Sequence, residues 1–157
     1  SGRAGIIKSV FDSEYKKLQG REGLFVALNE ACNDVAYVLG REFSVLEDIQ
    51  QTANPGINAT IKDRYFNSAC ATPAVIFPVL YKLKNSHVRK LSVGNAIYFE
   101  KILTSLQAKL PAEGLPLRLT LEQQGKFILG YYHQTQKRYE RREKIKMSEA
   151  IRTDMNL

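Results

Sequence analysis

Helical spacing of apolar residues is the feature that most limits how this sequence can fold. Between Asn33 and Asn54 the apolar side chains recur every three or four residues, so they fall on one face of a helix: Val35, Val38, Leu39, Phe43, Leu46 and Ile49. We find no segment with the polar-apolar alternation and β-branched enrichment of a half-buried strand. The sequence therefore predicts an all-α fold, a helical bundle of about five to six helices.

Residues that start and stop helices place the other elements. Asn33 and Asn58 are expected to cap two helices, and Pro73 stands at the first position of a third. Thr120 and Gln123 have the spacing of a capping box. The predicted helices run from Arg3 to about Leu18, from Asn33 to about Ala53, from Asn58 to about Phe66, from Pro73 to Leu91, from Ser92 to Leu110 and from Thr120 to about Met147. The segment from Gly20 to Cys32 is predicted to be a loop or a short helix.

The length of the chain suits one domain. With 157 residues it can bury a core but is short for two domains. We predict a single helical-bundle domain over residues 3–147 and a disordered tail over residues 148–157. Ser1 and Gly2 stand where an initiator methionine is expected, so we interpret them as a remnant of an expression vector.

The balance of charges points to a polyanionic partner. The 23 lysine and arginine residues exceed the 16 acidic ones, which gives a net charge of +7. Nucleic acid, an acidic protein and an anionic membrane surface are all open on charge alone. No stretch approaches the roughly 20 apolar residues of a membrane-spanning helix. Cys32 and Cys70 are too few for a disulfide framework and lack metal-ligand spacing, which favours a cytoplasmic location.

Few side chains are suited to catalysis. Of the two histidines, His87 shares the apolar face of its predicted helix with leucines, so we expect it to be structural. A nuclease using Asp63 with Glu100 or Glu122 is a minor alternative, because these carboxylates are isolated in the sequence. The glycines do not have the spacing of a phosphate-binding loop. We therefore expect no catalytic residues, no metal site and no cofactor.

The last predicted helix carries a basic strip, made of Lys126, Lys137, Arg138, Arg141, Arg142, Lys144 and Lys146. Tyr131, Tyr132 and Tyr139 lie between these cations and offer rings on which bases can stack. His133 and Gln134 could contact ribose, base or phosphate. The alternatives are a solvated face for the cations and a flank packed against a neighbouring helix for His133.

Two more groups of cations precede the strip. Lys82, Lys84, Arg89 and Lys90 lie on the polar side of the Pro73 helix, and Lys62 and Arg64 lie on the short helix before it. If the bundle brings these groups to the basic strip, they form one groove. The candidate nucleic-acid-binding residues are Lys62, Arg64, Lys82, Lys84, Arg89, Lys90, Lys126, Tyr131, His133, Gln134, Lys137, Arg138, Arg141 and Arg142.

Two glycines interrupt the same helix. Gly125 and Gly130 each cost roughly 1 kcal/mol relative to alanine inside a helix. Close approach of another backbone, either of a helix or of a nucleic-acid strand, would compensate for that cost.

Several ordered motifs resemble the C-terminal region of the large subunit of the type I-C CRISPR Cascade complex. They are Tyr37-Val38-Leu39-Gly40-Arg41 with Phe43-Ser44-Val45-Leu46-Glu47, Asn58-Ala59-Thr60-Ile61, Asp63-Arg64-Tyr65-Phe66, Ala71-Thr72-Pro73 with Phe77-Pro78, and the run from Gly125 to Gln134. The resemblance covers roughly Arg3 to Tyr139, and the segment from Gly20 to Cys32 departs from it most. In that family the same region also occurs as a separately made small subunit.

The resemblance implies a non-enzymatic part of an RNA-guided surveillance complex in a prokaryotic cytoplasm. In such complexes base pairing reads the sequence while protein holds backbones and the displaced strand. The implied partners are the backbone and large subunits, the CRISPR RNA and the target or displaced DNA strand, with a recruited nuclease-helicase acting indirectly. From the two basic clusters and the run of rings, alanine at Arg138, Arg141 and Arg142 is expected to weaken binding of single-stranded DNA or RNA and to flatten its salt dependence. The alternative is a purely structural assembly module.

Overall fold

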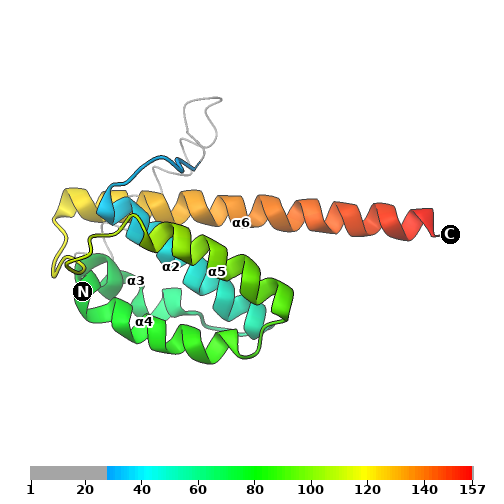
Figure 1. The fold of residues 1–157 in the computed structure, drawn as a ribbon, viewed down its shortest axis with the longest axis horizontal. Coiled ribbons are helices and arrows are strands. Elements are labelled where there is room, and N and C mark those ends of the chain that lie inside the picture. The colour runs from blue at the N-terminus through cyan, green and yellow to red at the C-terminus, as the bar shows by residue number, and fades with distance from the viewer. Residues whose placement is uncertain (1–27, 157) are drawn as a thin grey trace.

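The computed structural model describes residues 28–156 and is an all-α bundle, as the sequence predicted. Its five helices in that range are α2 (Val35–Ala53), α3 (Ile61–Ala71), α4 (Pro73–Val88), α5 (Val93–Gln107) and α6 (Leu121–Met155), and the range holds no strand (Figure 1). The predicted helix from Arg3 to Leu18, the Ser1-Gly2 remnant and the Gly20 to Ala27 part of the predicted loop lie outside the described residues. None of the described helices is long and apolar enough to cross a membrane.

Helix α2 is the centre of the bundle. It contacts each of the other four described helices, and every residue from Ala36 to Ile49 is buried. The predicted apolar face is therefore correct, but the polar face is covered as well. The covering element is α6, which lies along α2 with α4 on the far side (Figure 1). A helix buried on all sides must find partners for its polar side chains within the protein.

The helix starts agree with the sequence at three of five positions. Pro73 is the first residue of α4, and Ser92 and Thr120 cap α5 and α6. Asp34, not Asn33, caps α2, because its side chain accepts a hydrogen bond from the Tyr37 backbone N–H. For α3 the cap is Thr60 rather than Asn58, since Thr60 forms a capping box with the Asp63 side chain.

Aromatic rings fill the space between α2, α3 and α6. Phe43 lies 5.3 Å from Phe66 and 6.1 Å from Phe127 between ring centroids, and Phe66 lies 4.9 Å from Tyr131. All of these pairs have the edge-to-face geometry that aromatic rings favour. Cys70 is also buried in this core, and its thiol donates to the Gln124 backbone carbonyl at 3.6 Å.

Helices α2 and α6 cross at two glycines. A Cβ atom on Gly40 would lie 1.9 Å from the Phe127 carbonyl oxygen, and one on Gly130 would lie 2.1 Å from that of Tyr37. The close backbone approach predicted for Gly130 is thus confirmed, and the partner is a helix. Nothing lies within 4 Å of the Cβ position of Gly125, so the prediction is wrong there.

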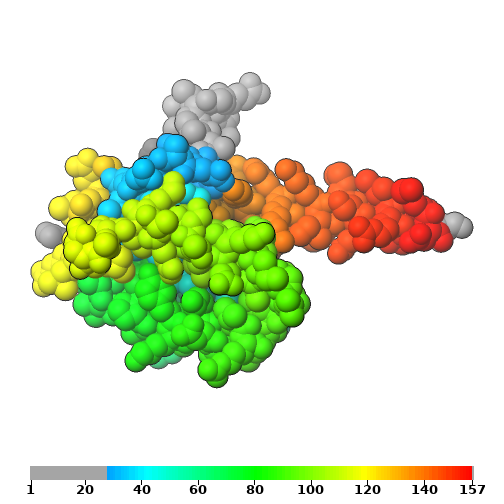
Figure 2. All heavy atoms as spheres, viewed as in Figure 1, coloured from blue at the N-terminus to red at the C-terminus, as the bar shows by residue number. Residues whose placement is uncertain are grey.

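Helix α6 extends further than the sequence indicated. Residues 148–155, which we predicted to belong to a disordered tail, continue the helix to Met155. The sequence contains no glycine or proline after Gly130, so no strong stop signal interrupts the helix-forming residues that follow. The last turns project beyond the body of the bundle (Figures 1 and 2).

Alanine substitution of the glycines tests the crossing. Gly40→Ala and Gly130→Ala should each lower the free energy of unfolding by about 1 to 3 kcal/mol, because the added methyl group meets backbone that cannot move aside alone. Gly125→Ala is the matched control and should raise it by about 0.5 to 1 kcal/mol through helix propensity. Urea unfolding followed by circular dichroism measures all three, and equal effects at the three sites would contradict the crossing.

Candidate nucleic-acid interface

Polar side chains join α2 and α6 next to the glycine crossing and beyond it along α6. The Tyr37 hydroxyl and His133 Nδ1 lie 2.8 Å apart, and Arg41 Nε donates to Gln134 Oε1 at 3.0 Å. Ser44 and Thr135 share a hydrogen bond of 2.8 Å between their hydroxyl oxygens. We call this row of contacts, together with the ion pairs described next, the α2–α6 seam. The residue numbers of the paired side chains increase along α2 and along α6 in the same order, so the two helices run parallel.

Ion pairs complete the seam toward the end of α2. Arg138 Nη1 lies 3.1 Å from Glu47 Oε1, and Arg138 Nε lies 3.6 Å from Asp48 Oδ2. Arg142 Nη2 lies 2.6 Å from Asp48 Oδ1. The Tyr131 hydroxyl donates to Glu47 Oε1 at 2.6 Å. Two carboxylates on α2 are therefore held by two arginines and a tyrosine on α6.

The seam uses many of the residues predicted to touch nucleic acid. Tyr131, His133, Gln134 and Arg138 are only 2%, 5%, 4% and 5% exposed. For His133 this matches the alternative of a flank packed against a neighbouring helix. Burial lowers the pKa of His133, which favours the neutral imidazole. Burial also raises the pKa of the Tyr131 hydroxyl, which suits a donor to Glu47.

The other predicted cations do not form one groove. Lys62 on α3 reaches α6, where its ammonium lies 5.0 Å from the ring centre of Tyr131 and 5.3 Å from that of Tyr132. Arg64 lies over its neighbour Tyr65. The α4 group lies across α2 from α6, because α2 occupies the space between those helices (Figure 1); its members are Lys82, Lys84, Arg89 and Lys90. The bundle therefore separates this group from the basic strip.

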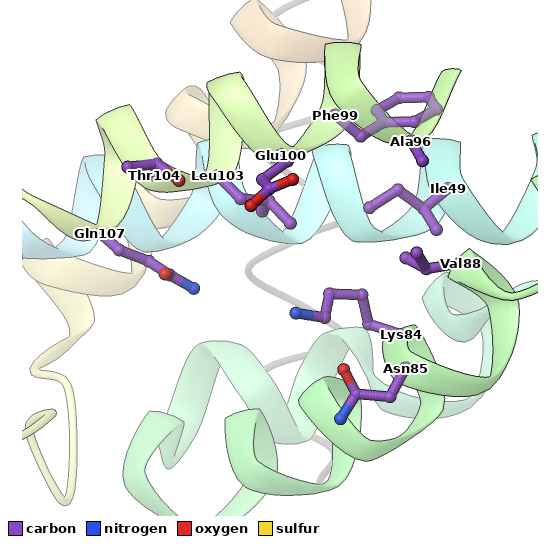
Figure 3. Close-up of a pocket in the computed structure, with 10 residues that line it drawn as sticks. All are labelled: Ile49, Lys84, Asn85, Val88, Ala96, Phe99, Glu100, Leu103, Thr104 and Gln107. Atoms are coloured by element: carbon purple, nitrogen blue, oxygen red, sulfur yellow. The ribbon is translucent and has the colours of Figure 1, made fainter. Parts of the chain in front are cut away.

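A hollow between α4 and α5 contains the carboxylate of Glu100. Lys84 and Glu100 point into it from opposite helices, beside Gln107 (Figure 3). Asp63 is engaged elsewhere, accepting from the Thr60 backbone N–H at 2.8 Å, so the structure does not bring it to Glu100. Within residues 28–156 no group of three histidine, cysteine, aspartate or glutamate side chains could hold a metal ion. His87 on α4 is half-buried, and burial lowers its pKa.

Glu42 lies fully buried behind this hollow. Its carboxyl oxygens accept from the Tyr81 hydroxyl and from Gln107 Nε2, each at 3.1 Å. Burial raises the pKa of Glu42 to about 7, against the opposing effect of these hydrogen bonds and of Lys84. This side chain is therefore titratable near neutral pH.

A second hollow lies beside α5 and α6 and is mainly basic. It has a volume of about 470 Å³, and its charged lining consists of Glu30, Arg41, Lys101, Lys109 and Lys137. We call it the α5–α6 hollow. Gln134 and Lys137 were predicted from the sequence, whereas Arg41, Lys101 and Lys109 were not. The sequence could have indicated Lys101 and Lys109, because they and Ser105 are spaced by four residues and so share one face of the predicted helix.

The exposed part of the basic strip continues from this hollow. Arg141 stacks on Tyr98 of α5, with its guanidinium carbon 3.7 Å from the ring centre. Lys144 and Lys146 are exposed further along α6. Lys126, at the other end of the strip, lies 3.4 Å from Asp34 and is exposed. The available cations of α6 therefore lie mainly beyond Gln136.

Comparison with known families matches most of the chain. Residues 1–139 match the model of a family described as CRISPR-associated protein (Cas_Csd1). No curated protein matches the chain.

Removal of Arg138 should destabilise the fold. Arg138→Ala leaves the buried carboxylate of Glu47 without its arginine and removes one of the two arginines at Asp48, so the free energy of unfolding should fall by about 3 to 5 kcal/mol. The exposed Lys146→Ala is the control and should change it by less than about 0.5 kcal/mol. Thermal and urea unfolding give both values, and a loss below about 1 kcal/mol in Arg138→Ala would contradict the seam.

Glu42 should make stability depend on pH. Because its folded pKa is about 7 and its unfolded value 4.5, the folded protein keeps a proton that the unfolded chain has lost between these pH values. Its contribution is therefore complete below pH 4.5 and lost as pH rises through 7. Relative to wild type, Glu42→Gln should gain up to about 3 kcal/mol between about pH 4.5 and pH 8. Urea unfolding of both proteins at these pH values measures the difference, and parallel pH profiles would disprove the shift.

Proposed function

Because the chain belongs to the Cas_Csd1 family of CRISPR-associated proteins, we propose that it is a non-catalytic, nucleic-acid-binding domain of a type I-C RNA-guided surveillance complex. In this role it stabilises the hybrid of guide RNA and target DNA, or the displaced DNA strand, during antiviral defence. Its neighbours are the backbone and large subunits of the complex in a prokaryotic cytoplasm. Cleavage belongs to a recruited nuclease-helicase.

One observation carries the nucleic-acid part of this proposal, the gathering of cations around the α5–α6 hollow. Lys101, Lys109 and Lys137 line the hollow, and Arg141 stacks beside it on Tyr98. These side chains come from α5, the turn after it and α6, so their proximity is a product of the fold. A cluster of this kind attracts a phosphate backbone and releases its counterions.

Two buried titratable side chains, His133 and Glu42, support the non-catalytic part of the proposal. His133 is held in the seam by the Tyr37 hydroxyl, and Glu42 is enclosed by Tyr81 and Gln107. Both side chains are buried and serve contacts between helices.

A second candidate function is assembly without direct nucleic-acid contact. Met147, Ile151 and Met155 are 67%, 53% and 81% exposed and follow one another at four-residue spacing on the projecting part of α6 (Figure 2). An amphipathic helix of this kind can dock into an apolar groove of a neighbouring subunit. Salt-dependent binding of nucleic acid to the isolated chain separates the two functions.

Alanine at three cations of the α5–α6 side should weaken binding of a single-stranded thymidine oligonucleotide. For the combined variant Lys101→Ala, Lys109→Ala and Lys144→Ala, the slope of log affinity against log salt should shrink by about 2, at roughly 0.7 per lost phosphate contact. Fluorescence anisotropy at several salt concentrations measures the slope.

The matched control lies on α4 and the turn that follows it. The combined variant Lys82→Ala, Arg89→Ala and Lys90→Ala removes the same charge from the other side of α2 and should leave the slope nearly unchanged. Equal losses in both variants would show a response to net charge alone and contradict this interface. If the wild-type chain shows no salt-dependent binding, the assembly function replaces the proposal.

A further inference from the structure

Arg41 is a buried cation whose guanidinium is only partly hydrogen-bonded. The residue is 6% exposed, and its Nε donates to Gln134. Its Nη1 is also buried and has no hydrogen-bond partner among residues 28–156. Leaving a buried charged donor unpaired is costly, so such a group in a stable fold calls for an explanation.

The seam contains a second buried arginine that shows what is missing at Arg41. Arg138 lies against Glu47 and Asp48, so two carboxylates balance its charge. Arg41 has only the neutral amide of Gln134 at the corresponding contact. The acid facing Arg41 is Glu30, and its carboxylate is paired with Lys137. The pair with Lys137 also holds the pKa of Glu30 below its usual value. The described part of the chain therefore gives Arg41 little counter-charge.

Arg41 also lines the α5–α6 hollow, where other groups suited to an anion gather. Lys101 and Lys109 supply two more positive charges, and Tyr98 and Ser105 supply hydroxyl groups. Lys109 donates to the Glu30 backbone carbonyl, a neutral acceptor. With Glu30 and Lys137 balancing one another, the lining retains three cations. The volume of about 470 Å³ is within the range of small-molecule sites, so a phosphate with an attached sugar can enter.

We propose that the α5–α6 hollow is a phosphate-binding site in which the Arg41 guanidinium donates to a phosphate oxygen. The planar guanidinium is suited to this contact, and Lys101 and Lys109 neutralise the remaining charge. If the proposed function holds, on which the choice of ligand rests, the phosphate belongs to the backbone of a bound strand. A free phosphate-bearing molecule has the same chemistry and is separated by experiment.

The test follows the guanidinium signals of the full chain by nuclear magnetic resonance. In protein labelled with ¹⁵N-arginine, the Arg41 Nε–H signal is assigned by its absence from Arg41→Lys. We expect this signal to shift on addition of inorganic pyrophosphate and of a single-stranded thymidine oligonucleotide. The Arg138 signal is the internal control and should not move, because its partners are carboxylates of the same chain. Arg41→Lys keeps the charge but loses the planar guanidinium with its several N–H donors. This variant should bind the oligonucleotide about tenfold more weakly.

The outcomes distinguish this site from the proposed function. If the oligonucleotide binds with a steep salt dependence while the Arg41 signal stays in place, the phosphate site is wrong and the proposed function stands. If pyrophosphate moves the Arg41 signal but the oligonucleotide does not bind, the site stands with a small phosphate-bearing ligand and the proposed function fails. If neither ligand moves the signal and no oligonucleotide binds, both are overturned.

Discussion

The close approach of α2 and α6 at Gly40 and Gly130 is the constraint on which the rest of the structure depends. With the two backbones in contact, the side chains that flank the crossing are brought within hydrogen-bond distance of one another. This geometry lets α2 be buried on every side although it carries Arg41, Glu42, Ser44, Glu47 and Asp48. Its buried charges are tolerable because α6 and its other neighbours supply partners for most of them. Larger residues at the crossing would separate the helices. The buried polar side chains of α2 would then be exposed or left without partners.

Local sequence signals predicted the helices well because they act over a few residues. Pro73, Ser92 and Thr120 mark helix starts through their own backbone or side chain, and the apolar spacing of α2 identifies its core face. The polar face of α2 could not be assigned in this way. Its partners on α6 lie about 90 residues further along the chain. From spacing alone, charged residues opposite an apolar face indicate contact with solvent, and only the fold shows that they meet another polar face.

The candidate interface was only partly predictable, because burial of its residues depends on contacts that are distant in sequence. A dense run of cations with tyrosines was visible in α6, but no local pattern divides that run into buried and exposed members. Arg138 proved to be an interior residue, while Lys137, its neighbour, lies at the surface hollow. Lys101 and Lys109 are scattered among apolar residues of α5 and the turn after it, so their contribution depends on α5 packing beside α6. Arg41 was not among the candidate residues, and its position at the hollow follows from the burial of α2.

The single helix α6 joins the interior of the bundle to a free end. Arg142 is paired with Asp48 of α2, and about 13 residues, or roughly 20 Å at the α-helical rise, follow that anchor before the helix ends at Met155. If α6 tilted at the seam, this segment would move as a rigid arm. A tilt of about 10° there would move the tip by roughly 3 to 4 Å. Lys137 of the hollow and the projecting tip belong to this one continuous helix, so a tilt of α6 at the seam would displace both together.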